Sequence, residues 1–229
     1  MRVVNLAHPD DQVDFETAVR RGLGKGQGLY FPERIEPRDD IDALLALPFA
    51  ERSARVLAQL TGLDLALVDT LVARAFDFPI RQTAVGERMH ALELFHGPSL
   101  AFKDFGARFL AGCLGAFSDG SPTTIMTATS GDTGAAVAHA FHGIEGVRAV
   151  ILYPRGRISP LQEKLFCTLG GNIHTISVDA DFDTCQALVK EAFDHEDLRT
   201  ALGLNSANSI NVARLLAQVC YYFESVAQL

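Results

Sequence analysis

The strongest constraint on the fold is an alternation of short apolar runs with amphipathic segments in the second half of the chain. The runs 123–129, 147–153 and 172–179 are short, and the second is apolar almost throughout. Such runs are typical of strands buried on both faces. Helices are predicted at 135–142 and after 159–162, a capping box with proline at the first helical position. Strands that alternate with helices predict an α/β fold with a parallel sheet.

Apolar residues at helical spacing predict further helices. In the first third of the chain, Asp40 precedes a helix over 41–47 that Pro48 would end. We place a domain boundary near residue 85, which gives a mainly helical N-terminal domain over 1–85 and an α/β region over 86–229. Three further helices are each predicted from one apolar stripe: Phe49, Val56, Leu57 and Leu60; Val68, Leu71, Val72 and Ala75; and Phe182, Cys185, Val189 and Phe193.

Composition narrows the function classes. The chain has 229 residues and a formal charge of −8, and an acidic chain is not expected to bind nucleic acid in general, because phosphates need a basic face. No apolar stretch approaches the roughly 20 residues that span a bilayer, and the N-terminus shows no signal-peptide pattern. We therefore expect a soluble, cytoplasmic protein with no membrane or nucleic-acid partner. The sequence leaves the oligomeric state open.

Metal binding is not expected from the cysteines or histidines. The four cysteines are too far apart in sequence for a CxxC pair, and His96, His139 and His142 do not have a metal-ligand spacing. We predict no metal site. The cysteines are Cys113, Cys167, Cys185 and Cys220.

The end of the chain is unusual for this architecture. Residues 211–229 predict one long helix, and no strand follows it. A parallel α/β enzyme usually continues with further strands. We therefore expect a truncated chain whose fold is incomplete at the C-terminus; a natural C-terminal helix is the alternative.

The first candidate for chemistry is Lys103. It stands among Phe95, Leu100, Phe102 and Phe105, and an apolar environment lowers the pKa of an amine by desolvation. A neutral amine can attack an aldehyde and form a Schiff base. The alternative is an exposed lysine whose stem covers apolar surface.

The second candidate is the turn between the predicted strand at 123–129 and the helix after it. Ser130, Gly131, Asp132, Thr133 and Gly134 combine two glycines, two hydroxyl groups and the start of a helix. Such a turn can hold a phosphate or carboxylate through backbone N–H groups and hydroxyls, and ligands of α/β sheets bind where strands end. The alternative is an ordinary turn that Ser130 or Asp132 caps.

The third candidate opens the last predicted helix. Asn208 and Ser209 are followed by Arg214 in the second turn of that helix, and arginine suits two-pronged recognition of phosphate. A polar loop with a helix cap is the alternative. Arg155 and Arg157 form a weaker anion candidate, which we interpret as a solvated turn.

Together these segments resemble the threonine synthase family over the whole length of the chain. The stretches 20–32 and 153–160 also resemble its bacterial members. The resemblance implies a pyridoxal phosphate (PLP) enzyme of fold type II, a lyase that converts O-phospho-L-homoserine and water to L-threonine and phosphate in the last step of threonine biosynthesis.

The resemblance also implies roles for individual residues. Lys103 matches the lysine that carries PLP and transfers protons at the substrate's α and β carbons. The loop 130–134 matches the one beside the PLP ring, where Ser130 and Thr133 would bind the substrate carboxylate. Asn208, Ser209 and Arg214 match the residues with which the family binds the substrate phosphate. Asp132 departs from the asparagine of many relatives in the wider fold, and this leaves its protonation state open.

One further departure concerns the cofactor. The family's glycine-rich loop for the PLP phosphate lies beyond Leu229, so we expect this chain to bind PLP weakly and to have little activity. Three rival hypotheses remain: another fold-type-II enzyme such as a threonine dehydratase or cysteine synthase, a noncatalytic anion-binding module, and an interaction domain over 1–85.

Overall fold

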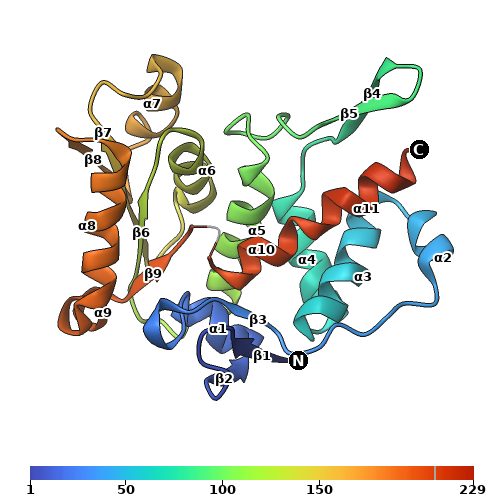
Figure 1. The fold of residues 1–229 in the computed structure, drawn as a ribbon, viewed down its shortest axis with the longest axis horizontal. Helices are drawn as coiled ribbons and strands as arrows, with labels where there is room; N and C mark the ends of the chain where they lie inside the picture. The colour runs from blue at the N-terminus through green and yellow to red at the C-terminus, as the bar shows by residue number, and fades with distance from the viewer. Residues whose placement is uncertain (209) are drawn as a thin grey trace.

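The second half of the molecule is built on a parallel sheet, in a computed structural model that describes residues 1–208 and 210–229 (Figure 1). The strand order is β8-β7-β6-β9, and every neighbouring pair is parallel. The predicted parallel α/β architecture is therefore confirmed. The strands are β6 (Thr123–Ala128), β7 (Val147–Pro154), β8 (Ile173–Val178) and β9 (Leu204–Ser206).

Helices cover both faces of this sheet. Alternate side chains of a strand point to opposite faces, and in β7 Ala149 and Ile151 join the larger apolar core while Leu152 joins a smaller cluster. The helices on the larger core are α6 (Asp132–Phe141) and α7 (Pro160–Cys167); the other face is covered by α8 (Phe182–Asp194), followed by α9 (Glu196–Leu202).

The N-terminal segment contains a small antiparallel sheet with the order β2-β1-β3. The sequence did not predict these strands, because strands of three or four residues are too short to show a period. Figure 1 shows this sheet below the rest of the molecule. Its elements are β1 (Arg2–Asn5), β2 (Gln12–Asp14), α1 (Phe15–Arg21), the 3₁₀ turn η1 (Lys25–Gln27) and β3 (Tyr30–Pro32).

The apolar stripes predicted in the first third are confirmed. The second stripe, from Val68 to Ala75, is buried at all four positions, and Gly62 ends the preceding helix in a left-handed conformation with φ 70°. These helices pack on the central helices and share one core with them. The helices are α2 (Ile41–Leu45), α3 (Phe49–Thr61), α4 (Leu65–Ala75), α5 (Lys103–Ala116), α10 (Val212–Ala217) and α11 (Val219–Ala227).

A hairpin of β4 (Arg81–Gly86) and β5 (Met89–Glu93) projects from the molecule near the expected domain boundary (Figure 1). It spans residue 85, and the larger core joins residues on both sides of it. The division into 1–85 and 86–229 stays a proposal.

The prediction of one helix over 211–229 is wrong. The structure has two helices, and the break lies at Gln218, whose backbone N–H donates to the oxygen of Leu215 in a tighter, 3₁₀-type turn. Among the described residues, no helix is long and apolar enough to cross a membrane.

Candidate active site

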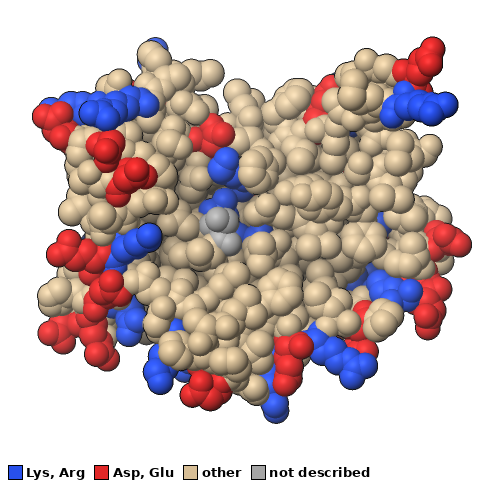
Figure 2. Space-filling view, viewed as in Figure 1, with Lys and Arg blue, Asp and Glu red and all other residues tan. Residues whose placement is uncertain are grey.

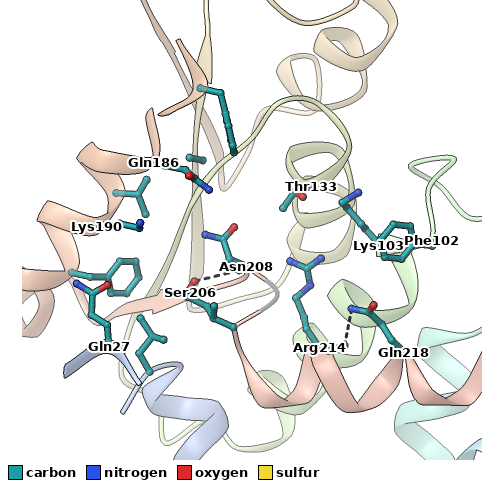
Figure 3. Close-up of a pocket in the computed structure, with 16 residues that line it drawn as sticks. Gln27, Phe102, Lys103, Thr133, Gln186, Lys190, Ser206, Asn208, Arg214 and Gln218 are labelled. Atoms are coloured by element: carbon teal, nitrogen blue, oxygen red, sulfur yellow. Dashed lines mark hydrogen bonds between the residues drawn. The ribbon is translucent and has the colours of Figure 1, made fainter. Parts of the chain in front are cut away.

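A cavity of about 470 Å³ opens where two strands of the parallel sheet end. Ala128 is the last residue of β6 and Ser206 the last of β9, and both line the cavity. Figure 3 shows α8 on one side of it and α5 and α10 on the other. This is the edge at which α/β sheets bind their ligands.

Lys103 is the first residue of α5 and reaches this cavity. Its Nζ lies 3.5 Å from Oδ2 of Asp132 and 4.5 Å from the ring centroid of Phe102. The expected apolar enclosure is wrong, because Phe95, Leu100 and Phe102 are exposed. Phe105 is buried, but it packs into the core on the other side of the helix. The amine is thus partly exposed, with a carboxylate beside it.

The turn before Lys103 is held by the buried carboxyl group of Asp104. The Ser99 N–H donates to Oδ2 of Asp104 at 2.9 Å. A Cβ on Gly97 would lie 2.4 Å from the same oxygen, so only glycine fits there. Leu100 adopts φ 59°, a strained conformation for a side chain of its size. Sequence reasoning missed Asp104, although an acid inside an apolar run was a visible signal.

Thr129 organises the glycine-rich turn after β6. Its Oγ1 accepts from the N–H of Gly131 at 2.9 Å and of Gly134 at 2.8 Å. Gly131 has φ 137°, in the region that favours glycine. The alternative in which Ser130 or Asp132 caps the helix is wrong, because Gly131 occupies the cap position and has no side chain.

The residues predicted in this turn divide between the cavity and its rim. Thr133 lines the cavity, whereas Ser130 is exposed and lies outside the lining. Asp132 contacts Lys103, and its Oδ1 accepts from Nε2 of Gln162 at 2.8 Å. The turn therefore brings one hydroxyl and one carboxylate toward the lysine.

The third predicted group comes from the segment that follows β9 and from α10. Asn208 lines the cavity, and its Oδ1 accepts from Oγ1 of Thr127 at 2.6 Å. Ser209 lies outside the described residues. Arg155 and Arg157 are exposed and do not line the cavity.

Arg214 lines the cavity as a buried cation and is 2% exposed. Its guanidinium donates to the carbonyl oxygen of Ala207, and its Nε has no hydrogen-bond partner among the described residues. Burial lowers the pKa of Arg214 to about 10, so it stays charged at neutral pH. A buried guanidinium with an unmet donor is suited to binding an anion.

Two buried amides that sequence reasoning missed fix this region from the N-terminal side. Nδ2 of Asn205 donates to the carbonyl oxygens of Val19 and Arg20 at 3.0 and 2.8 Å. Nδ2 of Asn211 donates to Val19 at 3.2 Å, and Asn211 also caps α10. The polar stretch at 204–211 thus holds α1 against β9 and α10.

The α8 wall contributes two polar residues that sequence reasoning also missed, Gln186 and Lys190. The sequence could have pointed to them, because they lie four residues apart and next to the apolar stripe of that helix. Figure 2 shows a few Lys and Arg atoms in the central hollow of the molecule, with an acidic group beside them, while most other charged atoms lie around its periphery. The described residues hold no group of three His, Cys, Asp or Glu side chains that could bind a metal.

This donor set fits a phosphorylated aldehyde. Lys103 offers an amine for the aldehyde carbon, and the cations Lys190 and Arg214, which line the same cavity, suit a phosphate group. No carboxylate is found among the described residues that line the cavity. Pyridoxal phosphate combines these two functional groups.

The comparisons with known proteins agree with this chemistry. Threonine synthase of Haemophilus influenzae is 62% identical over 231 residues, which cover 100% of this chain and 54% of that enzyme. The crystal structure of threonine synthase from Escherichia coli is similar with a TM-score of 0.95 and 58% identity, over 100% of this chain and 54% of that one. PLP-bound threonine synthase from Brucella melitensis has a TM-score of 0.89 and 34% identity, over 100% and 52%. The chain spans about half the length of these relatives.

A family model described as pyridoxal-phosphate dependent enzyme matches residues 78–229. The match covers most of the chain and includes Lys103, the 130–134 turn and Arg214. This chain belongs to the family of pyridoxal-phosphate dependent enzymes.

Proposed function

We propose that this chain forms the lysine-bearing half of a threonine synthase, which converts O-phospho-L-homoserine and water to L-threonine and phosphate. The observation that carries the proposal is the convergence of Lys103, Thr133, Asn208 and Arg214 on one cavity. Identity of 62% over the full length of the chain supports the same activity.

The residues have separate tasks in this proposal. Lys103 holds the cofactor and moves protons at the α and β carbons of the substrate, and Asp132 keeps its amine oriented at 3.5 Å. Thr133 donates to the substrate carboxylate from the cavity lining, and Ser130 would have to turn inward from the rim to donate to it as well. Bound PLP supplies an electron sink for the charge left at carbon when a proton is removed.

The substrate phosphate is assigned to residues that follow β9 in the chain. Asn208, Ser209 and Arg214 bind it, and Arg214 carries the positive charge. Because Arg214 is buried, its interaction with an anion is screened less than that of a surface arginine. When phosphate leaves, the bond between its ester oxygen and the γ carbon breaks; the γ carbon takes up a proton to become the methyl group, and the hydroxyl of water adds at the β carbon.

The test is trapping with borohydride. The chain is incubated with excess PLP, reduced and digested, and the modified peptides are mapped by mass beside those of Lys103→Ala. We expect the pyridoxyl label to concentrate on Lys103. Label spread evenly over surface lysines contradicts the proposal and favours the anion-binding module.

Turnover separates the proposal from its nearest rivals. Activity on O-phospho-L-homoserine rather than on threonine or O-acetylserine distinguishes a threonine synthase from a threonine dehydratase or a cysteine synthase. We expect weak PLP binding and little activity from the 229 residues alone; turnover at the rate of full-length relatives contradicts that expectation. A cytoplasmic location is part of the same proposal.

A further inference from the structure

The cavity wall opposite Lys103 carries two polar side chains to which the proposed reaction gives no task. Gln186 and Lys190 lie four residues apart on α8, so they share one face of that helix. Both line the cavity. Figure 3 shows them on the α8 side, across from Arg214 and Lys103.

Packing of α8 explains why this pair is presented to the cavity. Cys185, Val189 and Phe193 are buried against the sheet in the smaller apolar cluster. At about 100° per residue, Gln186 and Lys190 fall at one edge of that stripe. The buried stripe therefore fixes the rotation of the helix, and the polar pair faces the cavity along its edge.

The charge of the cavity is opposite to that of the chain. Lys103, Lys190 and Arg214 line it, and its described lining includes no carboxylate, although the net charge of the protein is −8. Two acids that contact lining residues are already engaged: Asp132 contacts Lys103, and Asp194 accepts from Gln27. Among the described residues Lys190 has no ion pair, so its charge is available to a ligand.

We propose that Gln186 and Lys190 form a phosphomonoester-binding subsite on α8. The inference rests on the proposed function in one respect: both the cofactor and the substrate named there carry a phosphomonoester. Two dianions in one cavity repel each other unless each has its own cation. Arg214 and Lys190 supply positive charge from opposite walls, so the cavity can hold both groups apart.

Titration with inorganic phosphate tests the subsite directly. It is done in the Lys103→Ala chain, which cannot attach the cofactor, and binding is followed by calorimetry. We expect Lys190→Gln to weaken phosphate binding roughly tenfold, since it removes a charged donor, and Gln186→Leu about threefold. Lys164→Gln is the matched control, because it removes the same charge from an exposed position on α7.

Two further arms identify which phosphate uses the subsite. In the first, labelling of Lys103 by pyridoxal phosphate is compared with labelling by pyridoxal, which has no phosphate. In the second, O-phosphohomoserine and homoserine are compared as amines that compete with Lys103 for pyridoxal, by how much label each removes from Lys103. If pyridoxal phosphate no longer labels Lys103 better than pyridoxal does in Lys190→Gln, the subsite binds the cofactor. If O-phosphohomoserine no longer competes better than homoserine does in that variant, the subsite binds the substrate.

The result that overturns the inference is phosphate affinity in Lys190→Gln equal to that in Lys164→Gln. Absence of measurable phosphate binding in the Lys103→Ala chain overturns it as well. Circular dichroism of each variant shows that the fold is retained, as the exposed position of Lys190 predicts. Failure of the proposed function has a different signature, namely an unlabelled Lys103 while the phosphate titration still responds to Lys190.

Discussion

The two walls of the cavity differ in how the fold supports them. The wall of α5 and α10 belongs to the larger core, where Arg214 is 2% exposed and the two helices meet at Gly106. The α8 wall rests on a cluster of six buried residues, and its Lys190 is exposed. A charge that must be placed accurately is held by the rigid wall, while the other wall offers a cation on a flexible stem.

The largest expected effect is a loss of stability that tests how differently the core supports the two walls. Phe109 is fully buried in the larger core, whereas Phe193 borders the cavity. We expect Phe109→Ala to lower the free energy of unfolding by roughly 4 kcal/mol and Phe193→Ala by roughly 2 kcal/mol, since Phe193 has fewer atoms packed around it. Urea unfolding measures both. Equal losses would show that the two walls are equally supported.

The next effect concerns the contact between α5 and α10. A Cβ on Gly106 would lie 2.9 Å from the carbonyl oxygen of Arg214, a backbone atom. Gly106→Ala should therefore cost about 2 kcal/mol through overpacking and weaken phosphate binding by displacing Arg214.

Gly115→Ala is its matched control in the same helix. A Cβ there meets nothing within 4 Å, so the substitution should stabilise the chain by about 0.5 kcal/mol through helix propensity. Thermal unfolding of the pair measures the difference. A destabilising Gly115→Ala would mean that helix propensity does not govern α5.

A smaller effect is expected at the turn after β6. Thr129→Val keeps the shape but leaves the N–H groups of Gly131 and Gly134 without their acceptor, at a cost of about 1 to 2 kcal/mol. Thr129→Ser keeps the hydroxyl and should retain more of the stability. Urea unfolding distinguishes the two, and a Thr129→Ser as unstable as Thr129→Val would exclude the hydroxyl as the cap.

The smallest effect is a dependence on pH. Burial raises the pKa of Asp104 above its ordinary value of 3.8, so the folded chain binds the proton more tightly than the unfolded chain does. The contribution of Asp104 to stability is therefore most favourable below pH 3.8 and falls as the pH rises from there through the raised pKa.

Asp104→Asn removes that dependence and keeps an acceptor for the Ser99 N–H. Its free energy of unfolding should change less between acidic and neutral pH than that of the unaltered chain. Urea unfolding at a series of pH values measures the difference. Identical pH profiles of the variant and the unaltered chain would show that Asp104 does not cause the pH dependence of stability.

Periodicity was informative where an element has one buried stripe. The residues Val68, Leu71, Val72 and Ala75 could be assigned to one helical face without any tertiary information, and the structure buries all four. The capping box at 159–162 is also confirmed. The three-residue strand β9 escaped prediction, because its pairing with β6 depends on residues about 80 positions earlier in the chain.

The candidate site was predictable in its parts and not in its assembly. The sequence pointed to Lys103, the turn 130–134 and Arg214 as separate candidates. It did not show that Asp132 reaches Lys103, that Ser130 turns to solvent, or that Thr129 caps the turn. Each of these depends on side-chain direction, which the fold of the turn decides.

The sequence by itself determined the parallel α/β architecture and the resemblance to a family, because buried strands, helical stripes and short motifs are local patterns. Only the tertiary structure decided which charges share one cavity. Lys103, Lys190 and Arg214 come from three helices far apart in the chain. They meet because parallel strands end at a common edge, and the packing of α5, α8 and α10 around that edge is a non-local property.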